Sequence, residues 1–470
     1  MKIVVSALTA LALAATAHAA TDWSKAEANA AALRDAALKG SLAYPILSSL
    51  TTEIGPRLEG SDAEHRAAQW GVDKLKSLGF KNVHIESFPV NGWTRGEERA
   101  AVVGEHAQRL FVTALGNSAA TPPEGIEAEI ALFHTWADFM AQPEGSLKGK
   151  IAVVTQPMVQ AQDGAGYGYA NAIRTRGPVE AAKRGAVAYM LRSLATGEMR
   201  SPHTGASNPA GIPAVSLAVP DAEQLDRLVA LGRPVRVRLV STPTIRPNAT
   251  ADTVIGEIPG REKPDEIVLI GGHLDSWDLG TGAIDDGAGV AITIATAKLI
   301  AEHGQPRRTI RVALFGAEEL NFSNAAYAKA HPAAEQARHV IASESDFGAE
   351  PPYAISLPAG AAGAPASPYG VALGRTVAPL RILIDRTPAR DGGSDLESLV
   401  GVPLAELRQD GTHYFDFHHT PDDTLDKVDP RQMDKAVAAW AAFTYLAADT
   451  DVDFRAIASS APPVPTGRRQ

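Results

Sequence analysis

The sequence contains no cysteine, which excludes disulfide frameworks, thiolate zinc sites and cysteine nucleophiles. Any metal held by side chains must therefore be bound by His, Asp or Glu. The sequence also lacks an excess of positive charge, because 44 Lys and Arg stand against 54 Asp and Glu, for a formal net charge of −10. Such a surface repels phosphate groups, so neither nucleic acid nor an anionic membrane surface is expected as a partner.

Long apolar runs are missing beyond the first 20 residues, so the mature chain is not expected to cross a membrane. Residues 1–19 differ from the rest. They begin with Met1-Lys2, continue as an Ala-rich apolar run and end in the small-x-small pattern Ala17-His18-Ala19. This pattern predicts a signal peptide cleaved near Ala20, and a periplasmic or secreted protein. A buried amphipathic helix is the alternative, but the run lacks the 3.6-residue period.

A chain of 470 residues, 45% hydrophobic and 21% charged, is long enough for two or three globular domains. Residues 23–49 and 63–78 are mainly helical in pattern, and residues 82–88 alternate like a strand. Short β-type runs separated by Gly, Pro and polar loops fill residues 120–245. From residue 267 the pattern alternates strand, loop and helix, which predicts a parallel sheet with both faces covered. Residues 459–470 hold three prolines and are predicted to be disordered.

Acidic and imidazole side chains follow three apolar runs that are predicted to be buried strands. The runs are residues 267–272, 309–316 and 339–342, and the side chains that follow them are His273, Asp275, Glu318, Glu319 and Asp346. Ligand sites form at the carboxyl ends of parallel strands, because the loops there converge. Adjacent side chains diverge, so Glu319 could bind a metal while Glu318 carries a proton.

Two further candidates lie in loops that precede helices. Asp285 stands just ahead of an apolar helix, so it suits a helix cap as well as a metal ligand. His419 lies in the loop before a helix expected over residues 430–448. Clustered carboxylates repel one another and are costly to desolvate. The sequence therefore predicts a cation among these side chains.

The order of these motifs resembles that of the co-catalytic dizinc exopeptidases, and in particular their carboxypeptidase Q-like members. The motifs are HLD at 273–275, GAIDD at 282–286, EE at 318–319, SD at 345–346 and HTPDDT at 419–424, with GPRLEGS at 55–61 and GGSD at 392–395. The resemblance covers nearly all of the mature chain.

This resemblance implies an α/β fold with a mostly parallel central sheet flanked by helices, a three-layer sandwich of the zinc-peptidase/phosphorylase-like type. Segments 147–154, 185–188 and 212–215 resemble a protease-associated (PA) domain. We therefore expect a smaller, β-rich PA domain at 120–245, inserted between the peptidase segments 20–119 and 246–458.

The resemblance also implies a set of metal ligands and their roles. Two Zn²⁺ ions would be bound by His273, Asp285, Glu319, Asp346 and His419. Asp285 would bridge both ions, with Glu319 and His419 on one and His273 and Asp346 on the other. Two dications balance three carboxylates and one hydroxide. Oxygen and imidazole donors suit zinc best, and Mn²⁺ or Co²⁺ would also fit.

Glu318 would act as the general base, and Asp275 would accept the second ring N–H of His273 and so orient that ligand. The family pattern further implies a cis peptide bond between Asp285 and Asp286. The predicted activity is hydrolysis of dipeptides, or removal of N-terminal residues from short peptides, and a homodimer is left open. The alternative is a non-catalytic peptide-binding or receptor-like protein on the same fold. Because all five ligand positions are filled, the enzyme is favoured.

Three other histidines are not expected to bind metal. His418 is adjacent to His419 and is expected to point away from the site. His134 and His203 fall in the predicted insertion, where a solvent-facing position is expected.

Overall fold

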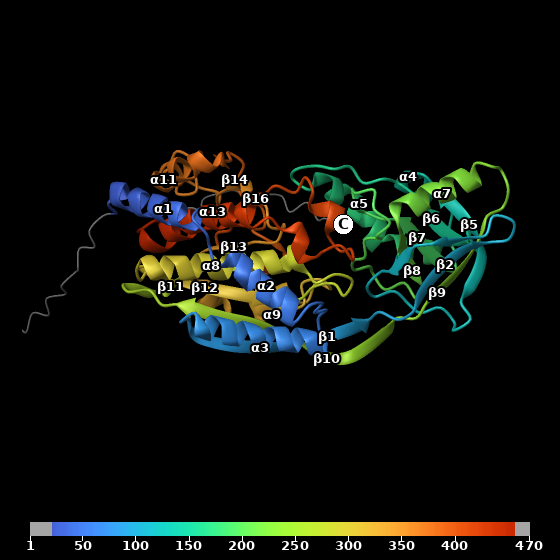
Figure 1. Cartoon of the computed structure of the whole chain (residues 1–470), viewed down its shortest axis with the longest axis horizontal. Helices are drawn as coiled ribbons and strands as arrows, with labels where there is room; N and C mark the ends of the chain where they lie inside the picture. Colours follow the sequence, from blue (N-terminus) through green and yellow to red (C-terminus); the bar gives the residue numbers. More distant parts are fainter. Residues whose placement is uncertain (1–20, 456–470) are drawn as a thin grey trace, which may run out of the picture.

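The computed structural model describes residues 21–455 (Figure 1). The predicted signal peptide and C-terminal tail, residues 1–19 and 459–470, lie outside the described residues. In Figure 1 the molecule is elongated, with one sheet and its helices at each end and helix α5 (Ala165–Thr175) between them. Within residues 21–455, no helix combines the length and the apolar character needed to cross a membrane.

The central sheet has five strands in the order β1-β10-β12-β11-β13. Strand β11 pairs in parallel with both β12 and β13, whereas β10 is antiparallel to β12 and to β1. The α/β fold class is confirmed, with the antiparallel strands gathered at one edge. The strands are β1 (Lys81–Thr94), β10 (Thr244–Ile258), β11 (Lys263–His273), β12 (Arg308–Phe315) and β13 (His339–Glu344).

Both faces of this sheet are buried, which explains the continuous apolar runs of its parallel strands. Along β11, Val268 and Ile270 belong to a core with the helices of one layer, while Ile267 and Leu269 pack with Tyr327 of helix α9 on the other face. The helices around this sheet are α1 (Trp23–Ala37), α2 (Ala43–Glu53), α3 (Asp62–Ser77), α8 (Ala288–His303), α9 (Ser323–Ala330), α10 (Ala333–Gln336), α11 (Pro368–Val377), α12 (Tyr414–Phe417) and α13 (Pro430–Asp449).

A small three-stranded sheet, ordered β15-β14-β16, extends the central sheet. A bridge between Ala342 in β13 and Leu404 joins the two sheets. Its strands are β14 (Pro352–Ser356), β15 (Leu383–Ile384) and β16 (Glu406–Gln409).

The second sheet has eight strands in the order β3-β2-β9-β5-β6-β7-β8-β4. It starts with β2 at Glu98, upstream of residue 120, where the insertion was expected to begin. Alternate residues of β6 face two cores, since Ile151 and Val153 pack with α7 and Ala152 and Val154 pack with α4, α5 and α6. The strands and the remaining helices are β2 (Glu98–Val103), β3 (Gln108–Leu110), β4 (Val112–Ala114), β5 (Ile126–Phe133), α4 (Trp136–Met140), β6 (Ile151–Val154), α6 (Gly177–Lys183), β7 (Ala188–Arg192), β8 (Ala214–Leu217), α7 (Val219–Val229) and β9 (Arg236–Ser241).

The loops that follow β11 and β12 pack directly against the second sheet. Trp277 and Leu320 belong to the same apolar cluster as Ala114 of β4 and Val215 of β8. Nearby, Arg95 forms an ion pair with Asp278 at 2.8 Å. These contacts fix the second sheet against the loops that carry the predicted metal ligands.

Candidate metal centre

The register of the parallel strands brings three of the predicted site segments to one edge of the central sheet. His273, the last residue of β11, is paired with Phe315, the last residue of β12. Gly271 is paired with Glu344 at the end of β13. The segments that follow β12 and β13, which contain Glu318, Glu319 and Asp346, therefore start beside His273.

The five predicted ligands converge around the carboxylate of Asp285. On one side, Nε2 of His419 lies 3.0 Å from Asp285 Oδ2 and 2.9 Å from Glu319 Oε2. On the other side, Nε2 of His273 lies 3.1 Å from Asp285 Oδ1 and 3.4 Å from Asp346 Oδ1. The two oxygens of Asp285 thus face two separate clusters, each with one histidine and one further carboxylate.

The electrostatics of this centre fit a bound cation. Burial raises the pKa values of Glu318 and Glu319 well above their ordinary range, and neighbouring carboxylates raise them further. Burial would also raise the pKa of Asp285, but the charge of His418 and the hydrogen bonds from His273 and His419 outweigh it and hold that pKa low. Carboxylate oxygen and imidazole nitrogen are donors that suit divalent zinc. The donor set and the crowding of like charges both fit metal ions at this position.

The carboxylate of Asp275 organises both glutamates through their backbone. Its Oδ1 accepts a hydrogen bond from the N–H of Glu318 at 3.0 Å, and its Oδ2 accepts one from the N–H of Glu319 at 3.2 Å. Nδ1 of His273 lies 3.1 Å from the main-chain carbonyl of Asp275 and 3.6 Å from Oδ1. The nearer acceptor for the His273 ring is therefore the backbone, not the carboxylate.

The backbone on both sides of Asp285 is held by buried carboxylates. Asp423 accepts hydrogen bonds from the N–H of Ile284 at 2.6 Å and of Asp285 at 3.2 Å. Asp286 accepts from the N–H of His273 and of Gly289, each at 3.0 Å. The Asp285-Asp286 peptide bond is cis, which confirms that expectation.

The GPRLEGS motif contributes a buried arginine that ties these loops together. The Arg57 side chain is fully buried and donates to the carbonyl of Leu274 at 2.5 Å, of Thr281 at 2.7 Å and of Gly282 at 2.8 Å. These carbonyls belong to the loop that joins His273 to Asp285. Arg57 thereby fixes the course of that loop.

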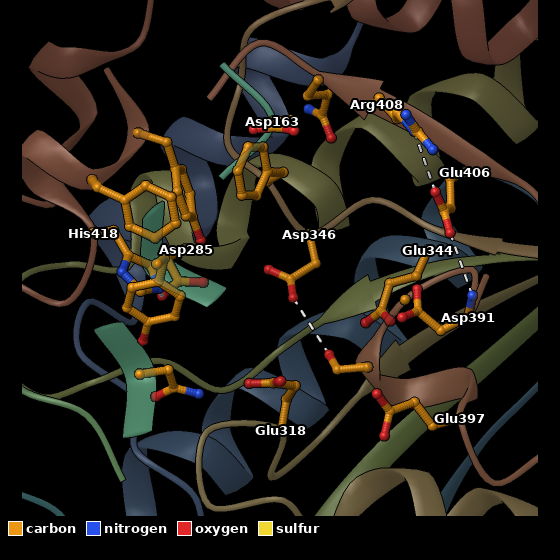
Figure 2. A pocket seen from close by; sticks show the side chains of 18 of the residues that line it. Asp163, Asp285, Glu318, Glu344, Asp346, Asp391, Glu397, Glu406, Arg408 and His418 are labelled. Atoms are coloured by element: carbon orange, nitrogen blue, oxygen red, sulfur yellow. Dashed lines mark hydrogen bonds and ion pairs between the residues drawn. The ribbon is translucent and has the colours of Figure 1, made fainter. Parts of the chain in front are cut away.

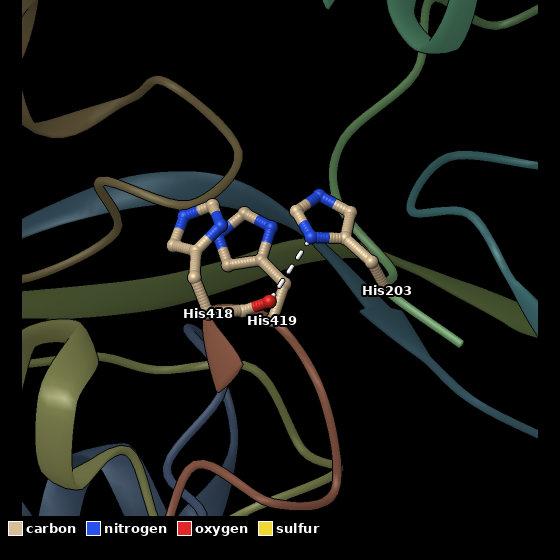
Figure 3. A group of neighbouring side chains, drawn as sticks. All are labelled: His203, His418 and His419. Carbon is tan, nitrogen blue, oxygen red and sulfur yellow. Dashed lines mark hydrogen bonds between the residues drawn. The ribbon is translucent and has the colours of Figure 1, made fainter. Parts of the chain in front are cut away.

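Two histidines that were not expected at the site lie against it. His203 is buried rather than solvent-facing, because its Nδ1 donates to the main-chain carbonyl of His418 at 3.0 Å (Figure 3). His418 does not point away, since its Nε2 lies 3.3 Å from Asp285 Oδ2. Both expectations were wrong. No local signal marks His203, which lies 215 residues before His418 and meets it only through tertiary packing. The side chain of His134 is 69% exposed, as expected.

Four of the five predicted ligands, all except His273, line a cavity of about 660 Å³ to which both the central-sheet and the second-sheet regions contribute residues (Figure 2). The central-sheet side contributes Glu318, Asp346 and Glu344. Burial, together with the charge of Asp395, raises the pKa of Glu344 well above its ordinary value. These three carboxyl groups form an acidic wall on this side of the cavity, and a cationic group bound beside them would favour their ionised forms.

Sequence and structure comparisons give consistent relatives. The family model described as peptidase family M28 matches residues 253–444. Carboxypeptidase Q from Bos taurus is 36% identical over 417 residues, which cover 87% of this chain and 85% of the relative. The crystal structure of a peptidase M28 precursor from Shewanella amazonensis SB2B is 42% identical, with a TM-score of 0.90, and covers 94% of this chain and 100% of that chain. A zinc aminopeptidase from Bacillus subtilis shares the fold, at 22% identity and a TM-score of 0.63, over 88% of this chain and 97% of its own.

Proposed function

The chain belongs to peptidase family M28 and is a metallo-exopeptidase, and from this premise we propose that it is an exported dizinc enzyme that cleaves dipeptides and the N-terminal residues of other short peptides. The observation that carries this proposal is the convergence of two histidine-carboxylate clusters on the two oxygens of Asp285. As part of the proposal, the region around the second sheet is a PA domain inserted in the peptidase domain.

His273, Asp285, Glu319, Asp346 and His419 are the residues that would hold the two ions. Zinc is favoured by the donor set and by the zinc aminopeptidase from Bacillus subtilis that shares the fold. Bound there, the ions would supply Lewis acidity, which polarises the scissile carbonyl and lowers the pKa of the attacking water.

Glu318 is the proton carrier in this proposal. Both glutamates line the cavity, but it is Glu319 whose carboxylate lies 2.9 Å from Nε2 of His419. Burial raises the pKa of Glu318 above that of a free carboxyl group, the direction expected for a carboxylate that takes a proton from water and passes it to the leaving amine. Asp275 keeps the two glutamates in these different roles, because it binds the backbone N–H of both.

The acidic wall gives the exopeptidase its end recognition. Glu344 is buried, lines the cavity and has one carboxylate oxygen without a hydrogen-bond partner among the described residues. A free α-ammonium on the substrate would pair with this wall, and a blocked amino group would not.

The test is an assay of purified mature protein on dipeptides with free and blocked ends, before chelation, after it, and after zinc is added back. We expect turnover that needs a free amino group, is lost on chelation and returns with zinc. Turnover of N-acetylated peptides would overturn the exopeptidase assignment. Binding of peptides without hydrolysis, at full metal loading, would favour the receptor-like alternative.

Glu318→Gln is the sharper test of mechanism. The variant should keep two zinc ions by elemental analysis and lose at least about 100-fold in kcat, the scale of a removed general base. Glu302→Gln is the matched control, because Glu302 is an exposed residue of α8. Loss of zinc from the Glu318 variant would mean that Glu318 and Glu319 have exchanged roles.

A further inference from the structure

Helix α5, from the second-sheet end of the molecule, presents one polar face to the catalytic cavity. Tyr167, Asn171 and Arg174 are spaced four and three residues apart, so they share a face of the helix. All three line the cavity that four of the predicted metal ligands also line. They lie outside residues 253–444, the segment that matches the family model.

Arg174 is a buried cation without an anionic partner. The residue is only 6% exposed, and no carboxylate among residues 21–455 forms an ion pair with it. By contrast Arg408, another arginine of the cavity wall, pairs with Asp385 at 3.0 Å. A guanidinium stays protonated in proteins, and a buried charge without a counter-charge is costly. Among the described residues, Arg174 therefore has no carboxylate in direct contact with its guanidinium.

The contacts that Arg174 does make hold it beside the metal centre. One terminal nitrogen, Nη1, lies 3.1 Å from His203 Nε2 and 3.4 Å from His419 Nδ1, and it also donates to the hydroxyl of Tyr167. Its Nε is buried and has no hydrogen-bond partner among the described residues. The guanidinium is thus positioned from one side and keeps donor capacity for a ligand.

The surroundings of the guanidinium leave space for it and offer a second donor group. At Gly205 an added Cβ would lie 2.1 Å from Arg174 Nη1, so this glycine is required for the observed position of the side chain. Asn171, one turn earlier on α5, also lines the cavity; its buried atom without a hydrogen-bond partner is the amide oxygen Oδ1, an acceptor, so the donor that it can offer a ligand is the N–H₂ group of the same amide. An arginine fork and an amide N–H₂ together match the oxygens of a carboxylate.

We propose that Arg174, assisted by Asn171, binds the free carboxylate of the substrate residue that leaves on hydrolysis. The inference rests on the proposed function. The inference adds that helix α5 selects substrates by length. A substrate carboxylate reaches Arg174 only when the peptide ends one residue beyond the scissile bond. The acidic wall and Arg174 then recognise the two opposite charges of a dipeptide. Figure 2 shows Glu344, of the acidic wall, and His418 on either side of Asp346. Arg174 belongs to the His418 side, because it contacts His203, which binds the main-chain carbonyl of His418.

The experiment compares Ala-Leu with Ala-Leu amide, which differ only in the charge of the C-terminal group. Zinc-loaded wild type should hydrolyse the free acid with a kcat/KM at least tenfold above that of the amide. Arg174→Gln should lower kcat/KM for the acid by about 100-fold and for the amide by less than threefold, at unchanged zinc content. Arg200→Gln is the matched control, because Arg200 lies in the same region but pairs with Asp221. It should leave both rates unchanged.

Several outcomes would overturn the inference. An equal loss of kcat/KM on both substrates would make Arg174 a positioning residue for His203 and His419. Wild-type kcat/KM on both substrates would mean that Arg174 has no role in substrate recognition. If Arg174→Gln does not fold, Asn171→Leu tests the same contact and should lower the acid rate selectively by about fivefold. An equal effect on acid and amide there would also refute the inference. No hydrolysis of either compound by zinc-loaded wild type would refute the proposed function as well.

Discussion

The variant Asp423→Asn tests how strongly the side chain of Asp423 stabilises the loop around Asp285. The Asp423 carboxylate is fully enclosed and accepts the N–H groups of Ile284 and Asp285. In Asp423→Asn the amide can keep the shorter bond, to Ile284 at 2.6 Å, but its N–H₂ group then faces the N–H of Asp285. A buried donor left without an acceptor costs about 1–3 kcal/mol. We expect the metal-free variant to lose about 2 kcal/mol of unfolding free energy.

The assay has two parts, denaturant unfolding of the metal-free protein and titration with zinc. Removing a group that supports a metal ligand typically lowers metal affinity by about 10–100-fold, and the same loss is expected here. Asp422→Asn is the matched control, because Asp422 is the adjacent residue and, within residues 21–455, its carboxylate accepts only from the Ser201 hydroxyl. If both variants unfold alike and bind zinc with wild-type affinity, the reasoning on Asp423 is refuted.

Two further predictions concern stability. Burial, with the charge of Arg311, lowers the pKa of His339 to about 4 from 6.5. As pH falls, the unfolded chain binds a proton near pH 6.5 while the folded chain does not until about pH 4. Wild type should therefore lose about 2 kcal/mol more than His339→Gln between pH 7 and 4.5 in denaturant unfolding, and parallel pH profiles would contradict this. Gly289→Ala places a Cβ 1.8 Å from the carbonyl of Ser345, so a loss of about 3 kcal/mol is expected in thermal unfolding. Gly168→Ala, with no atom within 4 Å of the added Cβ, should lose nothing.

The parts of the site that lie at strand ends were accessible from the sequence. Buried parallel strands read as continuous apolar runs, so the ends of β11 and β12 could be found without the structure. The polar residues that follow such ends are confined to one edge of the sheet. For this reason His273 and Glu319 could be named together as candidate ligands, and the family resemblance that included them is confirmed by the relatives.

The parts that depend on docking between distant segments were not accessible. His203 was expected to face solvent, because nothing near it in the sequence signals burial. Its position follows from the packing of the second-sheet region on the His418-His419 segment. The same applies to Arg174, which lies 245 residues before His419. Such contacts depend on tertiary packing and leave no periodic pattern.

The limits of the second sheet show the same effect. Strands β2 and β4 are short and precede residue 120, and they join this sheet by pairing with β9 and β8, which lie more than 100 residues further along the chain. Composition alone places the start of the inserted region near residue 120, where short β-type runs begin. Long-range strand pairing, which composition does not report, places the start of the sheet at Glu98.

The central claim is that two metal ions share the carboxylate of Asp285. Anomalous diffraction from crystals of the zinc-loaded protein, recorded at the zinc absorption edge, tests it most directly. The account predicts two peaks about 3.5–4 Å apart, one beside each oxygen of Asp285, with His419 and Glu319 at one peak and His273 and Asp346 at the other. A single peak at that carboxylate, or zinc bound only elsewhere in the molecule, would contradict it.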